Sequence, residues 1–88
     1  MAWTIEYAET ARRQLKKLDK LTARRIVDFM DHRVATQDDA RTLGKALSGP
    51  LGSLCRYRIS DFRAICDIQD GAKRILVLQI GHRSDVCR

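Results

Sequence analysis

A chain of 88 residues can bury only one hydrophobic core, so two independently stable domains are excluded and residues 1–88 are expected to form a single domain. The composition, with 44% hydrophobic residues, 32% charged residues and one proline, is that of a globular protein and excludes a disordered or fibrous chain. The formal net charge of +6 favours anionic partners, either nucleic acid or an acidic protein, over a membrane surface.

The sequence predicts a cytoplasmic protein with reduced thiols. No apolar run is long enough to cross a bilayer, and the first residues, MAWTIEYAE, lack the basic start and apolar core of a signal peptide. The cysteines Cys55, Cys66 and Cys87 are odd in number and form no CxxC pair, which argues against both a zinc site and a disulfide framework. We therefore expect neither a metal nor another cofactor.

The N-terminal part of the chain predicts one strand and two helices. Residues 2–7 alternate between apolar and polar side chains, as a half-buried strand does. Over residues 8–18 the apolar residues recur at helical spacing, and basic residues occupy the rest of the surface. Asp19 is a suitable N-cap for a second helix that continues to about Ala35. Two helices joined by so tight a link form a hairpin whose apolar faces need a sheet to cover.

The C-terminal part predicts three consecutive strands. Residues 43–53 are rich in Gly and Ser and contain the proline, which indicates an irregular connection. Strand-like runs follow at residues 54–60, 62–69 and 73–81, and a short polar tail ends the chain. The order is therefore strand, helix, helix, strand, strand, strand, then the tail.

The first of these turns predicts where the arginines lie. A two-residue loop at residues 60–61 pairs Arg58 with Arg63 on the neighbouring strand. Because side chains alternate between the two faces of a strand, one face is apolar and the other carries Arg56, Arg58 and Arg63. The apolar face, which we expect under the helices, comprises Cys55, Tyr57, Ile59, Phe62, Ala64, Cys66 and Ile68.

The second turn leaves two registers open. A two-residue loop at residues 70–71 puts Arg83 on the face covered by the helices. A three-residue loop at residues 70–72, with Gly71 in the left-handed conformation, brings Gln79 opposite Arg63 and sends Arg83 to the face of the other arginines. We prefer the three-residue loop because it buries the bulkiest residues of the last strand, which are Leu76, Leu78 and Ile80.

Four guanidinium groups on one exposed face repel one another, and this repulsion lowers stability. A fold tolerates such a cluster most readily when an anion binds there, and arginine suits phosphate because its planar fork bonds two oxygens. The alternative is that these arginines are only the solvated side of an amphipathic sheet.

The runs LCRYRISDFRAICDI and LQIGHRSDV, in this layout, resemble the RelE/ParE superfamily of bacterial type II toxin–antitoxin toxins, and its RelE branch in particular. The resemblance spans essentially the whole chain, from ARRQLKKLDK through GKALSGPLGSLCRYRISDFRAI to GHRSDV. It implies an α+β fold in which a small twisted antiparallel sheet carries a two-helix hairpin on one face. It also implies an endoribonuclease that cleaves mRNA in the ribosomal A site and so inhibits translation.

The resemblance also implies which residues are catalytic. The family's basic positions fall on Arg56, Arg58, Arg63 and Arg83. Well-studied members often have lysine at the first two positions, and arginine there retains phosphate binding but releases its proton less easily. The Tyr that usually packs on a substrate base is replaced by Cys87, which offers no stacking surface, so an attenuated activity is one expectation.

RNA carries its own nucleophile, the 2′-hydroxyl, so cleavage needs activation of that group, stabilisation of the phosphorane and protonation of the 5′-oxygen. We assign Arg56, Arg58 and Arg63 to phosphate binding and stabilisation of the transition-state charge, and the resemblance implies that Arg83 acts on the leaving-group side. His82 has a side chain suited to proton transfer and could position substrate, but the preferred register points it away from Arg83, which favours a structural role.

Two other functions stay open, a ParE-type inhibitor of DNA gyrase and a binding module that has lost catalysis. For a toxin, the resemblance implies a cognate RelB-like antitoxin, with the ribosome and mRNA as further partners. Operator DNA would be reached only through the antitoxin complex, and no membrane partner is expected.

Overall fold

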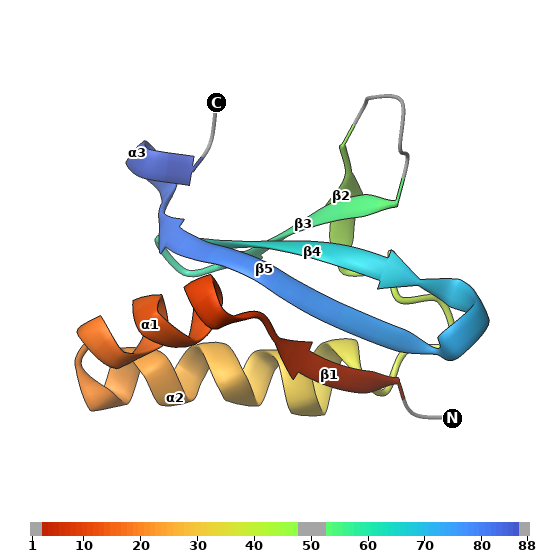
Figure 1. The fold of residues 1–88 in the computed structure, drawn as a ribbon, viewed down its shortest axis with the longest axis horizontal. Coiled ribbons are helices and arrows are strands. Elements are labelled where there is room, and N and C mark those ends of the chain that lie inside the picture. Colours follow the sequence, from red (N-terminus) through yellow and green to blue (C-terminus); the bar gives the residue numbers. More distant parts are fainter. Residues whose placement is uncertain (1–2, 48–52, 87–88) are drawn as a thin grey trace.

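The computed structural model describes residues 3–47 and 53–86, which form one five-stranded sheet with a helix hairpin against one face (Figure 1). The strands are β1 (Thr4–Tyr7), β2 (Gly44–Ala46), β3 (Leu54–Ile59), β4 (Phe62–Gln69) and β5 (Arg74–His82). The helices are α1 (Glu9–Lys17), α2 (Lys20–Asp28), which continues as a π-helix (Phe29–Val34), a 3-10 turn (Asp70–Ala72) and α3 (Arg83–Val86). The predicted α+β fold is confirmed, and β2 and α3 are additions to it.

The sheet has the strand order β1-β5-β4-β3-β2. Three of its four pairings are antiparallel, and β1 pairs with β5 in parallel at one edge. In β1 the predicted alternation holds, because Thr4 and Glu6 are exposed whereas Ile5 and Tyr7 pack against the core. Where β1 ends, α1 continues along β5, and the Oε1 atom of Gln14 accepts a hydrogen bond from the Ile80 amide at 2.6 Å.

The second helix begins and ends close to the predicted residues. Asp19 caps it, since its carboxylate accepts the Thr22 amide at 3.1 Å. The helix widens into the π form at its end, where the Ala35 amide donates to Met30 five residues back. Its buried side chains recur at helical spacing and are Ile26, Met30 and Val34. His32, on the π-helical part, is exposed.

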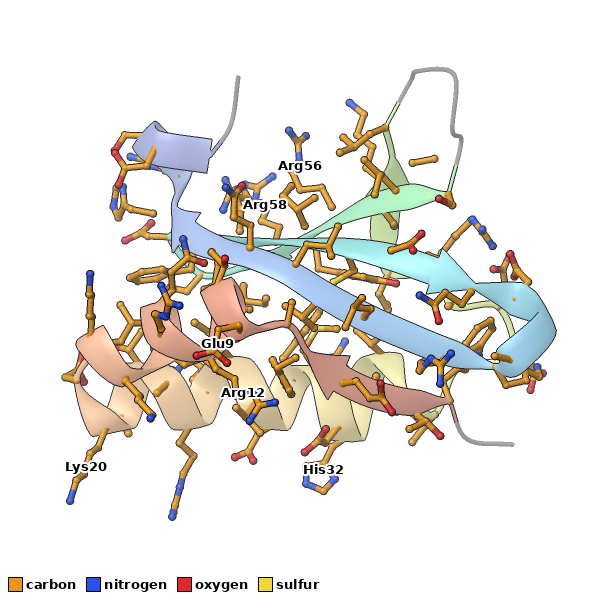
Figure 2. All side chains as sticks on the ribbon, viewed as in Figure 1. Glu9, Arg12, Lys20, His32, Arg56 and Arg58 are labelled. Carbon is orange, nitrogen blue, oxygen red and sulfur yellow. The ribbon has the colours of Figure 1, made fainter. Side chains whose placement is uncertain are left out.

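The predicted β3–β4 register is confirmed at every pair, including Arg58 with Arg63 and Cys55 with Cys66. Ser60 adopts a left-handed conformation with φ 57°, which the two-residue turn requires. The face toward the helices is apolar as predicted, and its buried members are Cys55, Tyr57, Ile59, Ala64, Cys66 and Ile68. Arg56 and Arg58 extend from the opposite face, whereas Lys20 and His32 lie beyond the helices (Figure 2).

The predicted β4–β5 register is wrong. The loop has four residues, 70–73, and the left-handed residue is Lys73 with φ 52° instead of Gly71. A β-bulge then shifts the pairing, because Cys66 pairs with Val77 and Ile65 with Gln79, which leaves Leu78 as the extra residue of β5. The buried residues of β5 are therefore Ile75, Val77 and Ile80, whereas Leu76 and Leu78 are only partly buried. As a further consequence, Arg63 faces Gly81 and not Gln79.

Residues 43–53 were expected to be irregular, but Gly44–Ala46 forms β2, which pairs antiparallel with β3. The approach of these strands needs a glycine, because a Cβ on Gly44 would lie 2.6 Å from the Cys55 Sγ and 2.8 Å from the Tyr57 ring. The Tyr57 hydroxyl donates to the Ala40 carbonyl and so fastens the segment that leads into β2. Burial of Tyr57 thus decides where β2 lies.

A second anchor of this segment is the ion pair between Arg41 and Asp70, which joins it to the β4–β5 loop. The Arg41 Nη1 and Nη2 atoms donate to the two carboxylate oxygens of Asp70, at 3.1 and 2.9 Å, in a bidentate contact. The Arg41 guanidinium holds the pKa of Asp70 below its usual range. Both side chains are partly exposed, which limits the contribution of the pair to stability to under about 1 kcal/mol.

This ion pair predicts a pH-dependent stability difference. A carboxyl group whose folded-state pKa is lowered contributes stability above its unfolded value, of about 4, and loses that contribution as the pH falls through the folded value. We therefore expect Asp70→Asn to lower the free energy of unfolding at neutral pH and to match the wild type in strong acid. Urea denaturation across this pH range measures the difference. Exposed Asp38, changed to Asn, is the control, and a difference that stays constant with pH would contradict the prediction.

Candidate active site on the arginine face of the sheet

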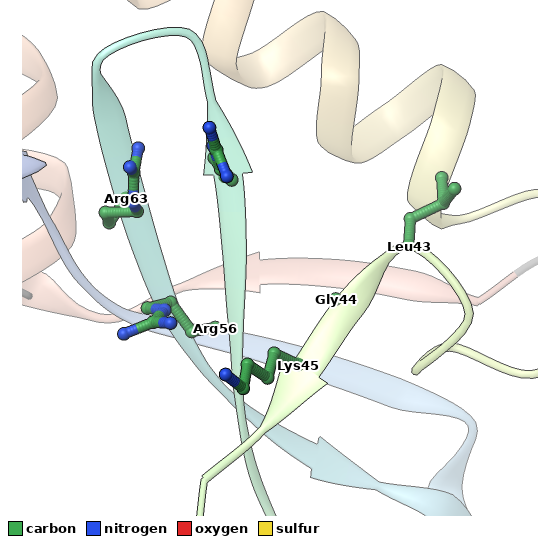
Figure 3. Close-up of a pocket in the computed structure, with 6 residues that line it drawn as sticks. Leu43, Gly44, Lys45, Arg56 and Arg63 are labelled. Atoms are coloured by element: carbon green, nitrogen blue, oxygen red, sulfur yellow. The ribbon is translucent and has the colours of Figure 1, made fainter.

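A cavity of about 430 Å³ lies on the face of the sheet opposite the helices, which we call the arginine face (Figure 3). Its lining residues come from β2, β3, β4 and the residue before β2, and are Leu43, Gly44, Lys45, Arg56, Arg58 and Arg63. Four of the six carry a positive charge, and none of the six carries a negative charge. This charge pattern suits a polyanion such as RNA.

Strand pairing brings the four cations together in two cross-strand pairs. Lys45 on β2 pairs with Arg56 on β3, and Arg58 on β3 pairs with Arg63 on β4. Directly opposed residues in antiparallel strands have Cα atoms roughly 4.5 to 5.5 Å apart, so their like charges repel. A bound phosphate would offset this repulsion, because each guanidinium can bond two of its oxygens.

Arg63 differs from the prediction of an exposed arginine, because only 8% of it is exposed. Its Nη1 atom donates to the carbonyls of Ser60 at 3.2 Å and Phe62 at 3.0 Å, and these contacts hold the side chain against the β3–β4 turn. Its Nε and Nη2 atoms make no hydrogen bond within the described part of the chain. Arg58 is exposed, and Arg56 is partly buried.

Arg83 lies just past the end of β5, as the first residue of α3. Its amide donates to the Asp61 carbonyl at 2.8 Å, so the start of α3 is attached to the turn between Arg58 and Arg63. The Arg83 side chain is exposed and is not among the residues that line the cavity. The structure thus gathers three of the four predicted arginines around the cavity and places the fourth next to their turn. Cys87 lies outside the described residues.

A family model described as "ParE toxin of type II toxin-antitoxin system, parDE" matches residues 5–86. The chain belongs to the RelE/ParE superfamily of type II toxins. It is 30% identical to Toxin RelG of Mycobacterium tuberculosis over 91 residues, which cover 100% of this chain and 99% of that protein.

Solved structures agree with this assignment. The toxin–antitoxin complex RelBE2 of M. tuberculosis matches with a TM-score of 0.83 and 26% identity, over 97% of this chain and 95% of that one. The isolated E. coli RelE toxin matches with a TM-score of 0.72 over 92% of this chain and 84% of that one. Because the second identity is only 14%, it bears on the fold alone.

In this toxin, His82 lies on the side of the sheet away from the cavity. It pairs with Phe62, and the two rings meet edge to face with their centres 5.7 Å apart. Its Nδ1 atom accepts the Ser84 amide at 3.3 Å and lies 2.9 Å from the Ser84 hydroxyl, so it caps the first turn of α3. This placement puts His82 outside the cavity, and its structural role stays a prediction.

Lys45 is the charged cavity residue that sequence reasoning missed. β2 has three residues, too few for an alternating pattern to be recognised, and its neighbours are small. A usable signal was the placement of a lysine between Gly44 and Ala46, within the run GKALSG that carries part of the family resemblance. A glycine followed by an outward-pointing cation is what an edge strand packed on Tyr57 needs.

Two thiols and one phenol of the described residues lie on the helix side of the sheet. Cys55 and Cys66 are buried neighbours with free thiols, as predicted, and burial raises the pKa of both thiols. Burial also raises the pKa of the Tyr57 hydroxyl. Among the described residues, no group of three or more His, Cys, Asp or Glu side chains could hold a metal ion. No helix in the same part of the chain is long and apolar enough to span a membrane.

Proposed function

We propose that this toxin, acting in the cytoplasm as a single domain of residues 1–88, is a ribosome-dependent endoribonuclease that cleaves mRNA and inhibits translation. One observation carries the proposal, namely the cavity lined by Lys45, Arg56, Arg58 and Arg63. Three guanidinium groups around one open cavity can bind the phosphate oxygens that gain charge as the phosphorane forms. The resemblance of the whole chain to the RelE branch supports the choice of mRNA as substrate.

In the proposed reaction the substrate's 2′-oxygen attacks the adjacent phosphorus and loses its proton. The bond from the 2′-oxygen to phosphorus forms, and the bond from phosphorus to the 5′-oxygen breaks. The products are a 2′,3′-cyclic phosphate and a 5′-hydroxyl, and no metal is needed because RNA supplies the nucleophile. Arg56, Arg58 and Arg63 stabilise the phosphorane, and Arg83 acts on the leaving-group side.

The proposed partners are a RelB-like antitoxin, the ribosome and mRNA, with operator DNA bound only through the antitoxin complex. The similar M. tuberculosis chain was solved as a toxin–antitoxin complex, which supports an antitoxin here. The formal net charge of +6 also suits an acidic partner segment or RNA.

Inhibition of DNA gyrase is the second candidate, because the matching family model is described as a ParE toxin. One experiment separates the candidates, in which growth arrest on expression is followed by mapping of mRNA 5′ ends and by a supercoiling assay with purified gyrase. We expect mRNA cut within ribosome-bound codons and unimpaired supercoiling, with Arg83→Ala reducing both arrest and cleavage. Inhibited supercoiling with intact mRNA would establish the gyrase function, and neither effect would indicate a binding module.

Cys87 provides a separate prediction about the level of activity. An aromatic ring at this position would stack on a base of the substrate, and such stacking contributes roughly 1 to 3 kcal/mol. We therefore expect Cys87→Tyr to increase the rate of mRNA cleavage by ribosome-bound toxin, measured in single turnover. Cys87→Ser is the control for loss of the thiol alone. A tyrosine variant that cleaves at the wild-type rate would show that the ring is dispensable.

A further inference from the structure

We infer that Lys45 is the catalytic base of this toxin, the group that accepts the proton of the attacking 2′-hydroxyl. The inference rests on the proposed ribonuclease function. It concerns the one step that the arginines of the cavity serve poorly, since a base must be able to exist without its proton.

The position of Lys45 is set by strand pairing. It lies directly opposite Arg56 in the β2–β3 ladder, on the arginine face, and it lines the same cavity as Arg58 and Arg63. Figure 3 shows Lys45 extending from β2 on the side of the strands where Arg56 and Arg63 lie. Its exposed side chain has a flexible four-carbon stem, which lets its amine reach a bound phosphodiester.

The chemistry of the cavity singles out this residue. The other three cations are arginines, whose guanidinium groups keep their protons at any working pH. A lysine amine can lose its proton and act as a general base. Well-studied members of the family often carry lysine at the positions of Arg56 and Arg58. In this chain both positions are arginine, and the lysine of the cavity is Lys45 on β2.

Five other titratable groups of the described chain are badly placed for this role. The Nδ1 atom of His82 caps α3, on the opposite side of the sheet. The Tyr57 hydroxyl and the Cys55 and Cys66 thiols are buried under the helices. Asp67, on β4, pairs with Leu54 and Leu76 and accepts a hydrogen bond from Gln69, and it does not line the cavity.

In the step we infer, the neutral Lys45 amine takes the proton of the 2′-hydroxyl as the 2′-oxygen bonds to phosphorus. The 5′-oxygen leaves and takes a proton from water or from an acid on the leaving-group side, and the Lys45 ammonium returns its proton to water. Atoms and charge balance without any oxidant, reductant or metal.

The test compares Lys45→Arg with wild type on an mRNA whose cleavage site on the ribosome has been mapped. Arginine keeps the charge but cannot act as a base, so we expect cleavage in single turnover to fall by about 10²-fold or more. Binding of a matching mRNA with a 2′-deoxy nucleotide at the cleavage site should stay at the wild-type level. Lys20→Arg, on the far side of the helices, is the matched control (Figure 2).

A second variant tests proton transfer itself. Lys45→Ala should lose cleavage and regain part of it with added methylamine, in proportion to the concentration of the free base. Cleavage by Lys45→Arg at the wild-type rate, or equal losses of binding and cleavage, would overturn the inference while leaving the ribonuclease function intact. A wild-type protein that cuts no ribosome-bound mRNA would overturn both.

Discussion

Replacing Arg56 and Arg58 together with alanine is expected to lower the rate of mRNA cleavage by about 10³-fold or more, because loss of one donor to a developing oxyanion already costs about 10²- to 10³-fold. Both side chains line the cavity, and neither belongs to the hydrophobic core. The free energy of unfolding is therefore expected to change far less than the rate of cleavage. Single-turnover cleavage on programmed ribosomes and urea denaturation measure the two effects separately.

Two further double variants show whether position or total charge matters. Lys17→Ala with Arg24→Ala removes two exposed cations from the helices and should leave cleavage nearly unchanged at the same ionic strength. Arg56→Lys with Arg58→Lys keeps both charges and should retain much of the activity. If the helix variant lost as much cleavage as the cavity variant, the activity would depend on net charge and the proposed site would be wrong.

Gly44→Ala is expected to lower the free energy of unfolding by about 1 to 3 kcal/mol. The new Cβ would lie 2.6 Å from the Cys55 Sγ and 2.8 Å from the Tyr57 ring. The Tyr57 ring has little room to move, because it is fully buried and its hydroxyl is bonded to Ala40. Strand β2 must therefore shift away from β3, and Lys45 moves with it.

Thermal denaturation measures this loss, and for a domain of this size it corresponds to a fall in Tm of at least about 4 °C. Cleavage should decrease as well, since Gly44 lines the cavity. Gly71→Ala is the matched control, because a Cβ there meets nothing within 4 Å. Equal melting temperatures for the Gly44 and Gly71 variants would contradict the packing argument.

The sequence predicted the β3–β4 hairpin because apolar and polar residues alternate between Cys55 and Ile59 and between Phe62 and Ala64, and a two-residue turn allows one register. Strand β5 lacks this information, since the run ILVLQI is almost wholly apolar and fits either face. Its register is decided instead by a four-residue loop and by the bulge at Leu78, neither of which has a local pattern. This is why Leu76 and Leu78 were wrongly expected in the core.

The sequence likewise predicted one part of the candidate site and not the other. Alternation, together with the two-residue turn at residues 60–61, predicted that Arg56, Arg58 and Arg63 share a face. The contribution of Lys45 depends on how β2 packs over Cys55 and Tyr57, which is a tertiary property. The burial of Arg63 was not predicted either. A strand pattern shows on which face a side chain lies, but not which backbone carbonyls it contacts.

Under the proposed function, the two carbonyl contacts of Arg63 give the two arginines of the Arg58–Arg63 pair different tasks in recognition. An arginine held by Ser60 and Phe62 has already given up much of its rotational freedom, whereas ordering a free side chain on binding costs about 0.5 to 1.5 kcal/mol. Arg63 is thus a rigid reference point to which a phosphate can be aligned. Exposed Arg58 can adjust to the shape of the bound RNA strand. One cross-strand pair of the sheet would then combine a fixed phosphate contact with an adaptable one.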